Sequence, residues 1–377
     1  MTEAELTLES VFDAYFDCRR TKRNSINQLR FEENLERNLV RLYHDLKSGE
    51  YRIGRSVAFV ITYPKVREVW AADFRDRVVH HVIYKAIFER FHKRFIRDSY
   101  ACIPNRGTHD GLRRVSGFAR SITQNWTKPA YFLKIDVANF FNSVDRSILI
   151  ELIRPYIPEK WLSDLIEMVA LHDPRPGAAM RSPQSLFARV PRHKSLLHAP
   201  DGKGLPIGNL TSQFFANIYL NELDQFAKHR LKAQRYGRYV DDVVMFHESA
   251  DVLNDWYRQI DEFLASRLAL RLHPNKKHLN QVHTGIDFTG FIIKPGRTYL
   301  RQTSVSNCKR KVSTWEREGS PLDVPTLQEL SQSLNSYLGM LRQVDGFKAR
   351  KALCRRVESL FLRADVDCTK TSLAGAY

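Results

Sequence analysis

The sequence predicts an α+β fold, and three features indicate it. Residues 238–246 hold two β-favouring runs around the adjacent Asp241 and Asp242, which is the pattern of a hairpin that carries acids at its turn. Residues 131–137 alternate apolar and polar side chains as a strand does. Beyond residue 300 the apolar residues recur at helical spacing. The chain therefore combines strands with a helical C-terminal part.

The N-terminal half is predicted to alternate helices and strands. Leucines at spacings of three, four and seven over residues 28–49 predict an amphipathic helix that ends near Gly49. A strand is expected at 57–63 and a helix at 75–97. Residues from about 172 to 203 are rich in Pro, Gly, Arg, His and Ser without a period, which predicts an irregular basic insertion at the surface.

The later segments are predicted to be mostly helical. A helix is expected at 214–231, directly after the glycine-containing run at 204–213. Three more helices are expected near the C-terminus, at 304–318, 326–342 and 346–363.

Composition indicates a folded protein with a polyanionic partner. The 377 residues are 43% hydrophobic, which is enough for a sizeable core, and 59 Lys and Arg against 42 Asp and Glu give a net charge of +17. Nucleic acid is the expected partner. There is no apolar run of about eighteen residues and the N-terminus is acidic, so neither a membrane span nor a signal peptide is predicted, and a cytoplasmic location is expected.

The cysteines and histidines do not form a recognisable metal or disulfide pattern. The five cysteines are odd in number and widely spread, which argues against a disulfide framework and against a zinc module. The adjacent His80 and His81 would point about 100° apart on a helix, so they are not expected to be joint ligands.

Four segments resemble, in their order, the motifs of reverse transcriptases. They are the strand that ends in Asp136, the Gly-Leu-Pro-Ile-Gly-Asn-Leu-Thr-Ser-Gln run at 204–213, the Tyr-Val-Asp-Asp turn at 239–242 and Gly-Ile-Asp-Phe-Thr-Gly-Phe at 285–291. The resemblance covers roughly residues 55–345. It implies an RNA-directed DNA polymerase with a right-hand fold of fingers, palm and helical thumb, in which 285–291 is the primer-grip hairpin.

The resemblance also implies a domain order. Residues 1–54 would be an N-terminal helical extension and 55–130 the fingers. Residues 131–298 would form the palm, whose antiparallel sheet carries the catalytic acids, and 299–377 the thumb with a C-terminal tail.

The acids point to metal-assisted nucleotidyl transfer. By resemblance, Asp136 and Asp241 bridge two Mg²⁺ ions, for which Mn²⁺ is a substitute, with the Val137 carbonyl as a further ligand and Asp242 completing the acidic patch. Three crowded carboxylates repel one another unless cations compensate. The alternative is that the acids pair with Lys or Arg. For Asp145, a purely structural role is expected.

Resemblance assigns three side chains near the incoming nucleotide. Phe141 matches the aromatic steric gate that excludes a 2′ hydroxyl, whereas Phe140 is expected in the core. Lys65 and Arg67 match the fingers residues that neutralise the triphosphate, and Arg67 is also expected to stack on the base. The alternative for both is an exposed basic pair beside a proline turn.

By resemblance, the glycine-containing run is expected to supply Ile207, Gly208 and Gln213 to the nucleotide and template. Many relatives have Gln and Pro where this chain has Ile207 and Gln213, and the departure resembles reverse transcriptases of diversity-generating retroelements and phage-defence systems. It is also expected to loosen base discrimination. Lys276, with Lys277 almost equally favoured, matches a lysine that can protonate pyrophosphate.

The implied partners are an RNA template, expected to be a dedicated noncoding RNA, a DNA or RNA primer, and dNTPs. A small accessory protein or partner subunit is also anticipated, in a retroelement or antiviral defence system. Two alternatives stay open. One is a template-independent or protein-primed DNA polymerase, and the other is a catalytically inactive nucleic-acid-binding scaffold.

Overall fold

The protein is described by a computed structural model that covers residues 5–20, 25–63, 65–318, 324–358, 362–365 and 367–373. The chain divides into two compact units. The first comprises Met1–Asn105, Lys134–Val243 and Asn254–Lys277, and the second comprises Arg106–Leu133, Val244–Leu253 and His278–Tyr377. These units do not follow the predicted boundaries at residues 130 and 298.

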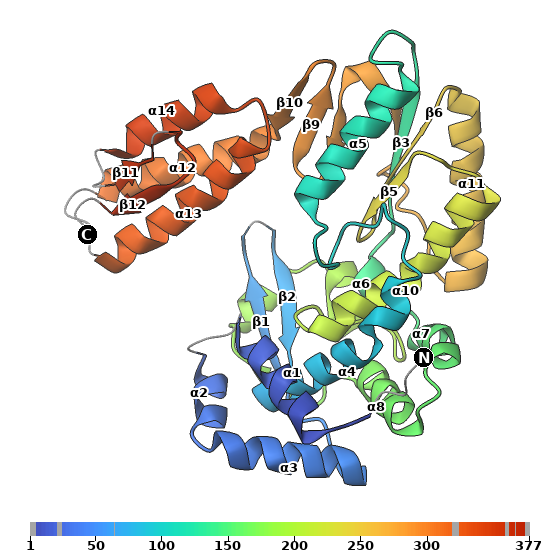
Figure 1. Cartoon of the computed structure of the whole chain (residues 1–377), viewed down its shortest axis with the longest axis vertical. Helices are drawn as coiled ribbons and strands as arrows, with labels where there is room; N and C mark the ends of the chain where they lie inside the picture. Colours follow the sequence, from blue (N-terminus) through green and yellow to red (C-terminus); the bar gives the residue numbers. More distant parts are fainter. Residues whose placement is uncertain are drawn as a thin grey trace. The chain divides into compact units, whose positions relative to one another are not determined.

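The first unit begins with helices that pack around α4 (Phe74–His92), as Figure 1 shows for α1 (Leu8–Arg20). The helix predicted over 28–49 is two helices, α2 (Ile26–Glu32) and α3 (Leu35–Ser48). Asn34 interrupts them with a non-helical φ of −134° and ψ of 53°. The predicted end at Gly49 is confirmed, because its φ of 76° is a left-handed cap that glycine adopts without strain.

A small sheet follows the N-terminal helices. It has the order β2-β1-β4, in which β1 (Val57–Ile61) is antiparallel to β2 (Arg67–Ala71) and parallel to β4 (Ala179–Met180). The strand predicted at 57–63 is therefore confirmed, two residues shorter.

The prediction that residues 172–203 form a surface insertion is wrong, because the segment packs into the first unit. It supplies β4, the short helix α9 (Gln184–Phe187) and two 3₁₀ turns, and it contributes to a hydrophobic cluster with β1 and β2. The buried members are Ala58, Val60, Trp70, Phe187, Val190, Leu196 and Ala199. The apolar residues are too irregularly spaced to show a period, but they fill one core.

A second sheet has the order β5-β6-β3-β7. Its strands are β3 (Tyr131–Asp136), β5 (Tyr236–Tyr239), β6 (Asp242–His247) and β7 (His278–Gln281). The strand predicted at 131–137 and the acid-bearing hairpin are both confirmed. Strands β3 and β6 are neighbours. The N–H of Val137, just after β3, donates to the carbonyl oxygen of Asp241, just before β6. The end of β3 and the start of β6 therefore lie together at one end of this sheet.

Besides α9, five α-helices lie between β3 and β7 in the sequence, from residue 140 to residue 268. They are α6 (Phe140–Ser143), α7 (Arg146–Ile153), α8 (Lys160–Leu171), α10 (Leu210–Gln225) and α11 (Ala250–Leu268). The predicted helix at 214–231 begins earlier, at Leu210, and continues after Gln225 as one π-helical turn, Phe226–Arg230. Most of α10 is buried, so it forms a rigid support within the first unit.

The second unit contains α5 (Thr108–Ile122) and a sheet of order β10-β9-β8. The hairpin predicted at 285–291 is confirmed as β8 (Ile286–Phe288) and β9 (Phe291–Lys294), and β10 (Arg297–Leu300) follows. Its two-residue turn is Thr289-Gly290, with φ of 49° and 92°. Positive φ at both positions is what a tight hairpin turn requires.

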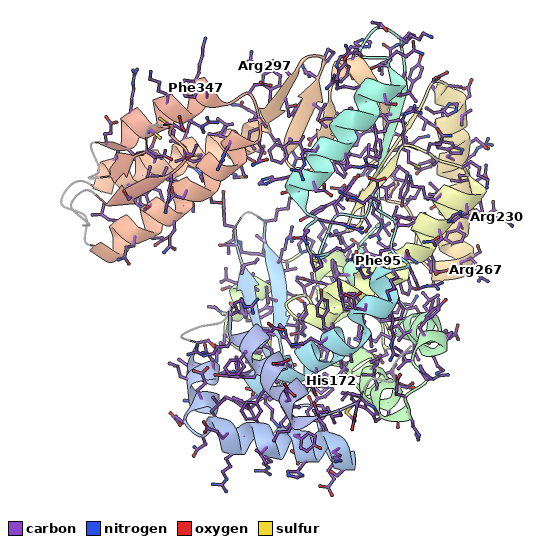
Figure 2. All side chains as sticks on the ribbon, viewed as in Figure 1. Phe95, His172, Arg230, Arg267, Arg297 and Phe347 are labelled. Carbon is purple, nitrogen blue, oxygen red and sulfur yellow. The ribbon has the colours of Figure 1, made fainter. Side chains whose placement is uncertain are left out.

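The C-terminal helices are α12 (Gln302–Glu318), α13 (Val324–Arg342) and α14 (Phe347–Val357). They share a core of Val312, Leu330, Leu334 and Val357. Their solvent side carries Phe347 at the start of α14, which is 54% exposed and labelled in Figure 2. No helix among the described residues is both long enough and apolar enough to cross a bilayer.

The last helix is predicted to end at Arg363. This end is wrong, because α14 stops at Val357. Residues 359–361 lie outside the described part. Strand β11 (Leu362–Ala364) then pairs antiparallel with β12 (Thr371–Leu373), and β12 packs on α13 (Figure 1). Pairing with the nearby strand β12 has overridden the local helical spacing.

Candidate active site

The turn between β5 and β6 presents two acids from a strained backbone. Asp241 lies in the two-residue turn and Asp242 begins β6. Val240, which precedes them, has a φ of 55°. Left-handed backbone is unfavourable for a β-branched residue, so the surrounding structure must hold this turn in place.

Asp136 meets this turn at the end of the neighbouring strand β3. The backbone N–H of Val137 donates to the Asp241 carbonyl oxygen at 3.4 Å. On its other side, the N–H of His273 donates to the Asp136 carbonyl oxygen at 2.8 Å. The backbone of Asp136 is therefore held between the acid-bearing turn and the segment that precedes Lys276.

The three carboxylates interact electrostatically. Burial and, after it, the negative charges of Asp136 and Asp242 together raise the pKa of Asp241 to about 6. An elevated pKa with identified charged neighbours is typical of functional sites. The structure therefore brings the acids predicted from two distant segments into one electrostatic cluster.

Two lysines partly neutralise this cluster. Lys276 Nζ lies 2.7 Å from Asp136 Oδ1, and Lys134 Nζ lies 3.6 Å from Asp242 Oδ1. The pairing of acids with lysine, which was the alternative in the sequence, therefore occurs at two of the three positions. Asp241 has no ion-pair partner within the contact distance among the described residues.

The chemistry of this donor set fits a divalent cation. Carboxylate oxygens are the ligands that hard ions such as Mg²⁺ prefer. Burial is the main cause of the raised pKa of Asp241, and a bound cation would offset the repulsion that Asp136 and Asp242 add to it. In the described part of the chain, however, no three Asp, Glu, His or Cys side chains are arranged to hold one ion. For a metal to bind, Lys134 would have to release Asp242 and Lys276 would have to release Asp136.

The structure distinguishes Lys276 from Lys277, which the sequence left almost equal. Lys276 reaches Asp136, whereas Lys277 Nζ donates to Asn254 Oδ1 at 2.7 Å and lies 4.3 Å from the centre of the Tyr257 ring. Of these two lysines, Lys276 is therefore the one that contacts an acid of the cluster.

Phe141 lies on α6, five residues after Asp136. It is half-buried, whereas Phe140 is 2% exposed and belongs to the core. The two rings are 5.4 Å apart. The Phe141 carbonyl oxygen accepts a 2.7 Å hydrogen bond from the N–H of Leu205, which ties α6 to the glycine-containing run.

The glycine-containing run packs closely against β2. The Ile207 carbonyl oxygen accepts from the N–H of Trp70 at 2.7 Å. Gly208 has a φ of 128°, and a Cβ placed there would lie 2.8 Å from Val69 Cγ1. A larger residue would therefore clash as well as strain the backbone. Gln213 is exposed, and its Oε1 accepts from Cys102 Sγ at 3.3 Å.

Lys65 and Arg67 are both exposed at the junction of β1 and β2. Pro64, which completes the predicted motif, lies outside the described residues. Within the described part, neither cation forms an ion pair with the acids of the cluster. The link between β2 and the site is the backbone contact of Trp70 with Ile207.

Sequence reasoning missed two charged groups near the acids. Lys134 lies two residues before Asp136 in β3, so the period of a strand places both on one face, and this signal was available. Arg238 and its partner Asp224 are both 0% exposed. No local pattern marks a charged residue as buried, so that pair was not predictable.

Comparison with known proteins identifies the chain. The sequence model for the family described as reverse transcriptase (RNA-dependent DNA polymerase) matches residues 64–293, which is more than half of the chain. The protein belongs to the reverse transcriptase family. It is therefore an RNA-directed DNA polymerase, a nucleotidyltransferase whose family uses an RNA template, a primer, nucleotides and divalent metal ions.

Two individual proteins are similar to this reverse transcriptase. Protein YkfC of Escherichia coli (strain K12) is 22% identical over 329 residues, which cover 78% of this chain and 80% of YkfC. Group II intron-encoded protein LtrA of Lactococcus lactis subsp. cremoris is 23% identical over 195 residues, 51% of this chain and 28% of LtrA. The chain thus matches most of YkfC but less than a third of LtrA.

The raised pKa of Asp241 gives a stability prediction for this reverse transcriptase. We expect Asp241→Asn to stabilise the metal-free protein at pH 8 by about 1 to 2 kcal/mol, because a repelled, partly buried charge is removed. The gain should shrink as the pH falls through about 6, where Asp241 takes up a proton in the folded protein, and vanish near pH 4.

Urea unfolding of both proteins in EDTA at pH 8, 6 and 4 measures this difference. A variant that is less stable than wild type at pH 8 would contradict the electrostatic description of the cluster.

Proposed function

We propose that this reverse transcriptase copies RNA into DNA by two-metal-ion nucleotidyl transfer at Asp136, Asp241 and Asp242. The observation that supports the proposal most is the electrostatic coupling of these acids, which come from neighbouring strands of one sheet. Carboxylates that repel one another are unfavourable in a folded protein, and a bound cation compensates this repulsion.

Asp136 and Asp241 would hold two Mg²⁺ ions, with Mn²⁺ as a substitute, together with the Val137 carbonyl and with Asp242 beside them. When bound, such ions activate the primer 3′ hydroxyl and neutralise charge on the phosphates. Lys276, already in contact with Asp136, would be released from the acid and donate a proton to the departing pyrophosphate.

The residues around the acids would position the nucleotide. Lys65 and Arg67 are proposed to hold the triphosphate, and Phe141 to exclude the 2′ hydroxyl of a ribonucleotide. The run that contains Ile207, Gly208 and Gln213 would face the base and the template. Its close backbone contact with β2 supports a common site for the run and for Arg67.

We propose the right-hand arrangement for the fold. Residues 55–130 would be the fingers, 131–298 the palm and 299–377 the thumb, after the N-terminal extension 1–54. The separate core of α12, α13 and α14 supports an independent helical thumb.

The biological setting is proposed to be a retroelement or an antiviral defence system, in the cytoplasm. Ile207 and Gln213 support this setting, because they depart from the common motif in the way that such reverse transcriptases do. A dedicated noncoding RNA would then serve as template, with a small accessory protein or partner subunit.

Primer extension on a defined template tests the activity. The purified protein is given an RNA template, a DNA primer, labelled dNTPs and Mg²⁺, and the product is sequenced. We expect a product that is complementary to the RNA and absent after RNase treatment or with EDTA.

Three outcomes would instead favour the rival functions. Product of unrelated sequence without template would indicate a template-independent polymerase, and label attached to the protein in the absence of primer would indicate protein priming. No product with any template or primer would indicate an inactive scaffold.

A further inference from the structure

Arg238 is a buried cation that contacts the backbone of the acid-bearing turn. It lies in β5, three residues before Asp241, and both its side chain and that of Asp224 on α10 are 0% exposed. Arg238 Nε and Nη2 donate to the two Asp224 oxygens at 2.8 and 2.6 Å. Burying two charges costs free energy that the ion pair often fails to recover, and apolar residues fill such space at least as well. A role beyond stability is therefore expected.

The contact that suggests this role is with Val240. Arg238 Nη1 donates to the Val240 carbonyl oxygen at 3.0 Å. This oxygen belongs to the peptide group that joins Val240 to Asp241. Because Val240 is held at a φ of 55°, its backbone would relax toward a more favourable conformation if this contact were lost.

The guanidinium is anchored on every side. Nη2 also donates to Ser99 Oγ at 3.1 Å, and Nη1 lies 3.4 Å from Asn217 Oδ1 on α10. The turn is thereby connected through one planar group to the buried helix α10 and to Ser99, in the segment between α4 and α5. A lysine, with a single ammonium group, cannot reproduce this fork of donors.

We propose that Arg238 is a positioning residue for nucleotidyl transfer. Its ion pair with Asp224 fixes the guanidinium, which clamps the Val240 carbonyl and keeps the strained turn in the conformation that directs Asp241 toward Asp136. The inference rests on the proposed function, because it assumes that these acids form the active site.

A double-mutant cycle between positions 238 and 240 tests the clamp. Arg238→Lys should lower kcat for cDNA synthesis on the order of tenfold, with a smaller change in KM for dNTP. Val240→Gly adopts a positive φ without strain. In the Arg238→Lys background it should therefore restore several-fold of the lost kcat, so that the two changes are strongly non-additive.

A second readout does not depend on turnover. Mn²⁺ binding to the protein with primer and template, followed by electron paramagnetic resonance without dNTP, should weaken in Arg238→Lys and recover in the double variant. Tyr236→Phe is the matched control, because it removes a 2.7 Å hydrogen bond to Asp224 but leaves the Val240 contact intact. It should lower stability and leave kcat and Mn²⁺ affinity unchanged.

Additive effects on kcat, or Mn²⁺ affinity that does not respond to Arg238→Lys, would overturn the proposal and leave Arg238 a core residue. If Arg238→Lys does not fold, Asp224→Asn replaces it in the same cycle, since it keeps the shape but releases the arginine. An inactive wild type would defeat the proposed function itself, whereas an active wild type with additive variants defeats only this inference.

Discussion

We expect Asp136→Asn to reduce cDNA synthesis at least about a thousandfold, which corresponds to ~4 kcal/mol of transition-state stabilisation. Asparagine keeps the size of the side chain but removes the charge that a divalent cation requires. It also leaves Lys276, now 2.7 Å from the acid, facing a neutral group. Single-turnover incorporation of a labelled dNTP with Mg²⁺ measures the loss.

Asp145→Asn is the matched control for this substitution. Asp145 is the N-cap of α7, and its Oδ1 accepts from the N–H groups of Ser147 and Ile148 at 3.1 and 3.4 Å. Asparagine is an equally good N-cap, so activity should stay at the wild-type level. Equal losses at both positions, with both variants folded by circular dichroism, would contradict the assignment of Asp136.

We expect Phe141→Val to admit ribonucleotides. The half-buried ring is fixed by its contact with Phe140 and by the hydrogen bond from Leu205 to its carbonyl oxygen. A shorter side chain leaves room for a 2′ hydroxyl, so the preference for dNTPs over rNTPs should fall by about a hundredfold, or ~3 kcal/mol. The ratio of kcat/KM for the two nucleotides measures this preference.

Phe140→Val separates selectivity from packing. Phe140 is buried, so the same truncation should cost about 1 to 3 kcal/mol of stability without changing the nucleotide preference. If Phe140→Val altered the ratio as much as Phe141→Val, the steric gate would be assigned to the wrong ring or to neither.

The sequence predicted the parts of the site that depend on local pattern. Alternation identified the strand that ends in Asp136, and two β-favouring runs around adjacent acids identified the hairpin of Asp241. The division of labour between Phe140 and Phe141 was available only through the resemblance. The burial of Phe140 and partial exposure of Phe141 agree with it.

The features that the sequence did not predict depend on distant partners. Whether Arg238 is buried is decided by Asp224, fourteen residues earlier on another element. Lys276 was separated from Lys277 only by its reach to Asp136, 140 residues away in the chain. Local propensity carries no information about such pairings.

The buried Glu68 on β2 has a consequence for protein engineering. Its carboxylate accepts hydrogen bonds from the Ser195 hydroxyl and, at 2.9 Å, from the Leu196 N–H, so it fastens the segment 172–203 onto the first hairpin. Trimming that segment to make a smaller enzyme would take two hydrogen-bond donors from this buried carboxylate and expose the indole of Trp70. We expect such a deletion to give a protein that aggregates and expresses poorly.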